Sequence, residues 1–279
     1  MKYRNTNMAE KKCVDLDNVS ETLLITLYTR ACESQRPDAV FKDEKSVEMV
    51  KRIDYDFSRA RMQAHDEAAI IIRLREFDRF TREFLVRYPD AVVVHIGCGL
   101  DTRFDRVDNG LVEWYDLDLP HVINLRRELM GEDRGRYHLV GSSVFEDDWL
   151  ETVNMHRQLP FLFLAEGVLP YFEEDQVRLL FRKLRDHFPG AEFIFDAMSP
   201  FVIWVDNLQL KHAKMEARLH WGLKNVRDIE KWSEDFRMLE EWYYFDHPEP
   251  RLKKYYWIRH FPAIAKSSGI LHYQLGSPS

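Results

Sequence analysis

The chain has 279 residues, of which 45% are apolar and 31% charged, a composition typical of a folded globular protein and not of a disordered one. Its 40 basic and 47 acidic side chains give a net charge of −7, and no basic block could follow a phosphate backbone, so nucleic acid is not expected as a partner. The N-terminus lacks an apolar stretch of signal-peptide type and no apolar run could span a bilayer, so we expect a cytoplasmic protein without membrane contact.

Glycine is absent from the chain before Gly97. A chain of strands and tight turns needs glycine and proline, so an all-β start is excluded and the N-terminal third is expected to be helical. In the helix predicted for 66–88, apolar residues recur at helical spacing, and Arg75 and Arg79 fall on the opposite side. Arg73 falls inside the apolar arc. Its guanidinium group therefore needs a carboxylate partner, which is either a protein acid or the carboxylate of an amino-acid-like ligand.

After residue 90, short apolar runs alternate with helical stretches. This alternation predicts an α/β core over 91–279, with a parallel sheet covered by helices on both faces, behind a helical layer over 1–90. Residues 201–235 regain helical spacing and are expected to form an insert in that core. The last two strands are expected to pair antiparallel at one edge. The runs that we assign to strands are 91–96, 112–117, 137–140, 160–165, 192–197, 238–245 and 270–275.

The first of these strands runs directly into Gly97-Cys-Gly99, where glycine permits a sharp turn and a close approach of a ligand to the backbone. The next strand ends in Asp116 and Asp118, 19 and 21 residues after Gly97, a spacing typical of a carboxylate that holds a ribose hydroxyl pair. Thr102 replaces the third glycine of a dinucleotide fingerprint, and no phosphate-binding loop is present. A nucleoside without phosphates fits better, and S-adenosylmethionine is the common one.

Further candidates follow the later strands. Glu166 stands at the carboxyl end of the strand predicted for 160–165, where open α/β sheets bind ligands, although a solvated loop acid would stand there too. Tyr171 and His121 are possible acid or base groups. The histidines show no metal-ligand pairing with cysteine, so we expect a mechanism without a metal.

Four segments together resemble the leucine carboxyl methyltransferase superfamily, and more closely its bacterial branch of tetracenomycin-polyketide-type O-methyltransferases. They are Arg73-Leu-Arg75-Glu-Phe-Asp78, Ile96-Gly-Cys-Gly-Leu-Asp-Thr-Arg103, Trp114-Tyr-Asp-Leu-Asp-Leu-Pro120 and Ala165-Glu-Gly-Val-Leu-Pro-Tyr171. The resemblance implies a class I S-adenosylmethionine-dependent methyltransferase fold, doubly wound around a seven-stranded sheet whose last strand is antiparallel. It does not name an acceptor.

At the matching positions, the resemblance implies that Gly97 and Gly99 form the turn under the cofactor. It implies that Asp118, with Asp116 as the nearby alternative, holds the ribose. Arg73 would then bind the methionine carboxylate.

The resemblance also implies that Glu166 contacts the methionine part of the cofactor. Where the family often has Asp-Leu near the adenine, this chain has Ser143-Val144. This departure leaves the adenine contact open, although a serine hydroxyl can also accept a hydrogen bond.

The expected activity is therefore methyl transfer from S-adenosylmethionine to a carboxyl or hydroxyl group of a small polyketide-like or phenolic acceptor. A protein C-terminal carboxyl methyltransferase is the main alternative, followed by a nicotinamide-dependent oxidoreductase and a non-catalytic cofactor-binding module. Five of the seven tryptophans follow residue 200, where they either line an acceptor slot or pack in the core.

Overall fold

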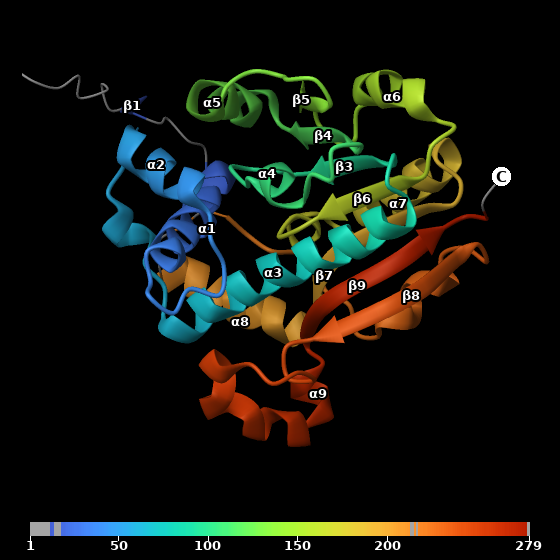
Figure 1. Cartoon of the computed structure of the whole chain (residues 1–279). Helices are drawn as coiled ribbons and strands as arrows, with labels where there is room; N and C mark the ends of the chain where they lie inside the picture. Colours follow the sequence, from blue (N-terminus) through green and yellow to red (C-terminus); the bar gives the residue numbers. More distant parts are fainter. Residues whose placement is uncertain (1–11, 14–17, 213–214, 216, 278–279) are drawn as a thin grey trace, which may run out of the picture.

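The computed structural model describes residues 12–13, 18–212, 215 and 217–277. Its main sheet has seven strands in the order β5-β4-β3-β6-β7-β9-β8 (Figure 1). β9 pairs antiparallel with both of its neighbours, and the other neighbouring strands pair in parallel. The predicted α/β class, the antiparallel last strand and the antiparallel pair at one edge are thus confirmed. The strands are β3 (Val92–Ile96), β4 (Glu113–Asp118), β5 (Tyr137–Gly141), β6 (Phe161–Ala165), β7 (Ala191–Met198), β8 (Phe236–Tyr243) and β9 (Ser268–Leu275).

The described part of the N-terminal region is mainly helical, as predicted, whereas residues 1–11 and 14–17 of the expected layer lie outside the described residues. It contains α1 (Asn18–Ser34), α2 (Glu44–Arg52), the short η1 (Phe57–Ala60) and α3 (Ala64–Arg87). A small parallel ladder, which the sequence analysis did not predict, pairs β1 (Lys12–Cys13) with β2 (Ile53–Asp54). The division into two parts at residue 90 stays a prediction.

Helices cover both faces of the sheet. On one face, the apolar side of α3 packs against the sheet together with α4 (Arg103–Val107) and α5 (Pro120–Met130), and Val93 of β3 belongs to this layer. On the other face, α6 (Asp148–Val153) and α7 (Glu174–His187) cover Val92 and Val94. Successive strand residues therefore serve opposite layers, and the sheet is buried on both sides.

The predicted insert is helical only in part. α8 (Pro200–His212) and the short η4 (Val226–Lys231) are helical, but Leu219, inside the range 201–235 that was expected to be helical, lies beyond the end of α8. The backbone N–H groups of this segment make hydrogen bonds of a non-helical kind. Leu219 N donates to the side-chain Oδ1 of Asn207, and Leu223 N donates to the carbonyl of Met198. These partners replace the carbonyl four residues earlier, so the helix does not continue.

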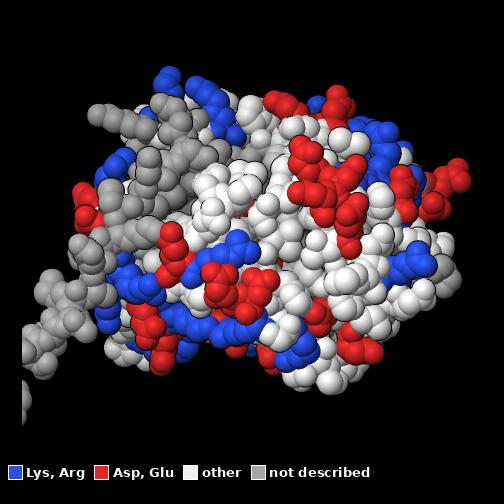
Figure 2. Space-filling view, turned by 90° about the horizontal axis from the view of Figure 1, so that it is seen from above, with Lys and Arg blue, Asp and Glu red and all other residues white. Residues whose placement is uncertain are grey.

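The remaining short helices are η2 (Asn154–His156), η3 (Leu169–Tyr171), η5 (Pro250–His260) and α9 (Pro262–Ala265), of which η5 and α9 form the lobe at the bottom of Figure 1. On the face seen in Figure 2, basic and acidic side chains lie interspersed and form no broad surface of one sign. Within the described ranges, no helix combines the length and the apolar character that a membrane span requires.

Candidate active site

A cavity of about 940 Å³ lies at the carboxyl ends of the parallel strands. Its lining includes Gly97 after β3, Asp118 at the end of β4 and Glu166 after β6, together with residues of α1, α3 and α8. Parallel strands bring their carboxyl ends to one edge of the sheet, so segments far apart in sequence meet there. The volume is near the upper end of the range for small-molecule sites, about 300–1,000 Å³.

The glycine turn is required by both conformation and space. Gly97 and Gly99 have φ angles of +62° and +50°, which side-chain-bearing residues rarely adopt. A Cβ atom on Gly97 would lie 2.4 Å from Cγ2 of Val168. Thr102, in the place of a third glycine, is buried, and its Oγ1 accepts a hydrogen bond from Arg106 at 2.8 Å. At this turn the cavity is lined by backbone without side chains, which allows a nucleoside to approach closely.

The two acids of β4 lie in different surroundings. Asp118 lines the cavity, and its two carboxylate oxygens accept hydrogen bonds from the backbone N–H groups of Gly99 and Leu119, each at 2.7 Å. Burial raises the pKa of Asp118 above its usual value, although these hydrogen bonds oppose the shift. Each oxygen keeps a second lone pair. Asp118 is thus fixed in position and able to accept hydrogen bonds from a ligand.

Asp116 does not line the cavity. Its carboxylate lies in the core, where it pairs with Arg126 and accepts hydrogen bonds from Tyr137 Oη at 2.6 Å and Trp114 Nε1 at 2.8 Å. Burial disfavours the charged form, but Arg126, His95 and Tyr137 together outweigh it, so the pKa of Asp116 lies below its usual value. The structure therefore does not bring Asp116 to the site. Its carboxylate oxygens instead bind Arg126 of α5 and other groups of the core.

Arg73 extends from α3 to the edge of the cavity. Its Nε donates to Glu166 Oε1 at 3.0 Å and its Nη1 donates to Asp196 Oδ2 at 2.9 Å. Burial lowers the pKa of Arg73, but the negative charges of Asp196 and Glu166 together raise it by more. The net pKa is above the usual value, so the group stays charged. Nη2 makes no hydrogen bond to a described residue and lies beside Gly167. Protein acids thus engage two of the three nitrogens, and the third has no hydrogen-bond partner among the described residues.

Glu166 is held by two arginines and is not a solvated loop acid. Besides Arg73, its Oε2 accepts a hydrogen bond from Nη2 of Arg103 at 2.6 Å. Arg103 is fully buried and also pairs with Asp78 of α3 at 2.9 Å and with Asp101 at 3.1 Å. Ion pairs between charged residues of the segments 73–78 and 96–103 therefore connect α3 to the glycine turn.

Two of these residues were not predicted as site residues. Asp196 is an acid inside the otherwise apolar run Phe193-Ile-Phe-Asp196-Ala, and an acid there needs a buried cation. Arg103, two residues after Asp101, offered a weaker signal, because arginines at the start of a helix are usually solvated.

The remaining candidates differ in position. Ser143 and Val144, after β5, line the cavity, and Ser143 Oγ accepts a hydrogen bond from Phe145 N at 3.3 Å. Tyr171 also lines it, and its hydroxyl donates to Thr22 Oγ1 at 3.4 Å. Burial raises the pKa of Tyr171, so its hydroxyl stays neutral at neutral pH. His121 is exposed on the first turn of α5 and is not part of the cavity lining, so it is not brought to the site.

The five tryptophans after residue 200 do not contribute to the cavity. None of the five lines the cavity; Trp221 and Trp242 are buried in the core, whereas Trp204 and Trp257 are exposed. Other side chains of α8 and of the segments after β8, such as Val202 and Phe245, line the cavity instead. No group of three or more histidine, cysteine or acidic side chains in the described part of the chain could hold a metal ion.

The family model described as leucine carboxyl methyltransferase matches residues 23–185, more than half of the chain. The chain is 39% identical to the tetracenomycin polyketide synthesis O-methyltransferase TcmP of Streptomyces glaucescens over 236 residues, 84% of this chain and 86% of the relative. It is 33% identical to the S-adenosyl-L-methionine-dependent methyltransferase dpfgK of Gibberella zeae, over 90% of this chain and 91% of the relative. Leucine carboxyl methyltransferase 1 of Caenorhabditis elegans is 25% identical over 59% of this chain and 60% of the relative.

Solved structures share the fold. A protein of the duf574 family from Streptomyces avermitilis superposes with a TM-score of 0.56 at 13% identity, over 94% of this chain and 100% of that one. A structure described as a putative methyltransferase from Thermobifida fusca superposes with a TM-score of 0.53 at 16% identity, over 90% and 94%.

Proposed function

Because the chain belongs to the leucine carboxyl methyltransferase family and is a methyltransferase that uses S-adenosylmethionine, we propose that it methylates an oxygen atom of a small molecule. The acceptor would be a polyketide-like or phenolic compound, methylated on a hydroxyl or carboxyl group. The similarity to TcmP, whose name describes an O-methyltransferase of polyketide synthesis, supports this proposal.

The observation that carries the proposal is the composition of the cavity. Its lining offers the donors and acceptors that the cofactor requires, namely the glycine turn, Asp118 and Arg73. The same lining also includes apolar side chains such as Val202, Leu219 and Phe245. A volume of about 940 Å³ accommodates a cofactor together with a small acceptor.

Several residues of the cavity lining fit S-adenosylmethionine. Asp118 would accept hydrogen bonds from the ribose hydroxyls, and Nη2 of Arg73 would bind the methionine carboxylate. Ser143 and Val144 would lie against the adenine. When bound, the cofactor supplies an electrophilic methyl group on a positively charged sulfur. The protein contributes position and the exclusion of water, because in-line displacement depends on the alignment of the two reacting atoms.

Methylation of a protein C-terminus is the second candidate, since the family also contains leucine carboxyl methyltransferases. The net charge of −7 disfavours an acidic peptide end as the substrate. A nicotinamide-dependent reaction has less support, because Thr102 occupies the place of the third glycine and its hydroxyl is bonded to Arg106.

Isothermal titration with S-adenosylhomocysteine, and with NAD(P) for comparison, tests the first step. We expect S-adenosylhomocysteine alone to bind, with one molecule per chain. Incubation of cell extract with methyl-labelled S-adenosylmethionine then tests the acceptor class. We expect the label in the small-molecule fraction. Label on protein bands would instead support the second candidate, and a lack of S-adenosylhomocysteine binding would exclude both.

A further inference from the structure

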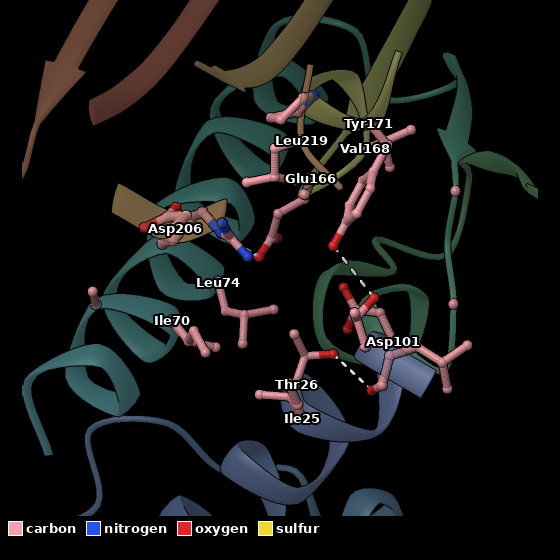
Figure 3. Close-up of a pocket in the computed structure, with 18 of the residues that line it drawn as sticks. Ile25, Thr26, Ile70, Leu74, Asp101, Glu166, Val168, Tyr171, Asp206 and Leu219 are labelled. Atoms are coloured by element: carbon pink, nitrogen blue, oxygen red, sulfur yellow. Dashed lines mark hydrogen bonds and ion pairs between the residues drawn. The ribbon is translucent and has the colours of Figure 1, made fainter. Parts of the chain in front are cut away.

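The cavity lining contains a carboxylate with an unusual environment. Asp206 lies on α8 in the run Val202-Ile-Trp-Val-Asp206, and it lines the cavity. In Figure 3, Asp206 and Glu166 lie on the same side of the cavity, with Ile70 and Leu74 of α3 beside them. A charged group among apolar side chains is costly unless it has a partner or a function.

Among the described residues, Asp206 has neither a hydrogen bond nor an ion pair, and the other carboxylates of the cavity each have partners. Glu166 is bonded to two arginines, Asp118 to two backbone N–H groups, and Asp101 to Arg103. Asp66, at the start of α3, lies 3.4 Å from Nε2 of His65. Asp206 thus keeps its full capacity to accept a hydrogen bond from a molecule in the cavity.

The charges around Asp206 disfavour an anionic acceptor. Arg73, the cation that acts on Asp206, is already paired with Glu166 and Asp196, and Asp66 adds a further negative charge. Arg59, in η1, and Arg61, directly after it, also line the cavity, but both are exposed and neither is among the groups that shift the pKa of Asp206. A carboxylate placed next to Asp206 would meet uncompensated negative charge, whereas a neutral hydroxyl group would find an acceptor.

The pKa of Asp206 is suited to a general base. Burial and, to a smaller extent, the charge of Asp66 raise its pKa, Arg73 opposes the shift, and the resulting pKa is about 6. Tyr171 and Tyr244, which also interact electrostatically with Asp206, have pKa values raised by burial, so their hydroxyl groups are neutral at neutral pH. A base works best when its pKa is close to the working pH.

We propose that the acceptor is a hydroxyaromatic compound and that Asp206 takes the proton of the hydroxyl group that is methylated. This inference rests on the proposed function. The hydroxyl oxygen forms a bond to the methyl carbon, the carbon–sulfur bond of the methyl donor breaks with its electron pair kept by sulfur, and the hydroxyl proton passes to the Asp206 carboxylate. The products are an aryl methyl ether, a neutral thioether and a protonated Asp206, which returns the proton to water.

Two probes with the same ring system test this inference by binding: 2-naphthol, which carries a hydroxyl group, and 2-naphthoate, which carries a carboxylate. Both are titrated at pH 7.5 into the whole protein loaded with S-adenosylhomocysteine. We expect wild type to bind 2-naphthol at least tenfold more tightly than 2-naphthoate, and Asp206→Asn to reduce this preference to less than threefold. The control is Asp228→Asn, which removes the same charge from a surface ion pair with Lys231 and should keep the full preference.

Methyl transfer to 2-naphthol, followed as 2-methoxynaphthalene, tests the proton transfer. We expect Asp206→Asn to lower kcat by about 100-fold or more, with the affinity for S-adenosylhomocysteine unchanged within twofold. In wild type kcat/KM should fall below about pH 6, and in Asp66→Asn this fall should move to lower pH because a repelling charge is gone. If Asp206 had a purely structural role, Asp66→Asn would not shift the pH at which kcat/KM falls.

The inference is overturned if 2-naphthoate binds as tightly as 2-naphthol, if neither probe binds, if Asp206→Asn keeps the preference, or if wild type forms no ether. All of these outcomes are compatible with normal binding of S-adenosylhomocysteine. Loss of that binding in wild type would instead contradict the proposed function, so the two failures are distinguishable.

Discussion

Arg73 and Glu166 are separated by 93 residues in sequence, yet a hydrogen bond of 3.0 Å joins the guanidinium Nε of one to the carboxylate of the other at the edge of the cavity. Asp196, from the next strand of the sheet, holds a second nitrogen of Arg73 at 2.9 Å. The arginine is thereby fixed in orientation before any ligand arrives. Such preorganisation favours a bound carboxylate, because little side-chain freedom is left to lose.

We expect Arg73→Lys to lower the affinity for S-adenosylhomocysteine by about tenfold or more, because a hydrogen bond to a charged group contributes roughly 1.5–3 kcal/mol and lysine cannot reproduce the planar fork. Isothermal titration measures this change. Lysine keeps the positive charge beside Glu166 and Asp196, so the variant should stay folded. Arg79→Ala, on the solvent side of the same helix, is the control and should bind as wild type does. Equal affinity in Arg73→Lys would refute the assigned role.

The two acids of β4 should respond differently to the same substitution. Asp118→Asn should lower the affinity for S-adenosylhomocysteine by tenfold or more while the melting temperature changes little. Asp116→Asn should destabilise the fold by about 3–5 kcal/mol, because it leaves the buried Arg126 without its counter-charge. Titration calorimetry and urea unfolding of both variants measure the two effects. A weaker cofactor complex in a folded Asp116→Asn, with Asp118→Asn unaffected, would reverse the assignment.

Gly97→Ala should destabilise the protein and weaken cofactor binding, because the new Cβ meets Val168 at 2.4 Å in a backbone conformation of positive φ. Gly110→Ala is the matched control, since Gly110 also has a positive φ of +84° but has nothing within 4 Å. We expect the control to cost about 1 kcal/mol and Gly97→Ala to cost more, measured by urea unfolding. The double variant Gly97→Ala with Val168→Ala should recover the steric part; no recovery would mean that the contact is not the cause.

Asp206→Asn should increase stability at pH 7.5. The pKa of Asp206 is raised to about 6 in the folded protein, so its charged form is disfavoured on folding. Removing that charge should raise the free energy of unfolding by roughly 1–3 kcal/mol at pH 7.5. As the pH falls through 6 towards 4, wild-type Asp206 takes up a proton in the folded state and the difference should shrink. Urea unfolding at pH 7.5 and pH 4.5 measures it; a difference that grows towards low pH would contradict the raised pKa.

The sequence was sufficient for features that depend on local pattern. The inward position of Arg73 followed from the helical periodicity of its neighbours, and the glycine turn followed from a buried strand that runs into two glycines. Both features depend on residues close together in the chain, so no knowledge of distant contacts was needed. The order of the seven strands in the sheet, in contrast, was not predicted, because it depends on pairing between segments far apart in the chain.

Features that depend on contacts between distant segments could not be predicted. Asp116 and Asp118 point to the same face of one strand, and only the packing of Arg126 against Asp116 separates a core acid from a cavity acid. The pairing of Arg73 with Asp196 joins positions 123 residues apart. Asp206 was overlooked because a single acid in an apolar helix is usually solvated. Only the position of α8 at the cavity shows that Asp206 is part of the cavity lining.

The most direct test of the proposed site is a crystal structure of the protein bound to S-adenosylhomocysteine. We expect the ribose hydroxyls within hydrogen-bond distance of Asp118, and the ligand carboxylate on Nη2 of Arg73, with Arg73 still paired to Glu166 and Asp196. The vacant space beside the sulfur should then face Asp206. A ligand that lies elsewhere, or that contacts neither Asp118 nor Arg73, would contradict the proposed site.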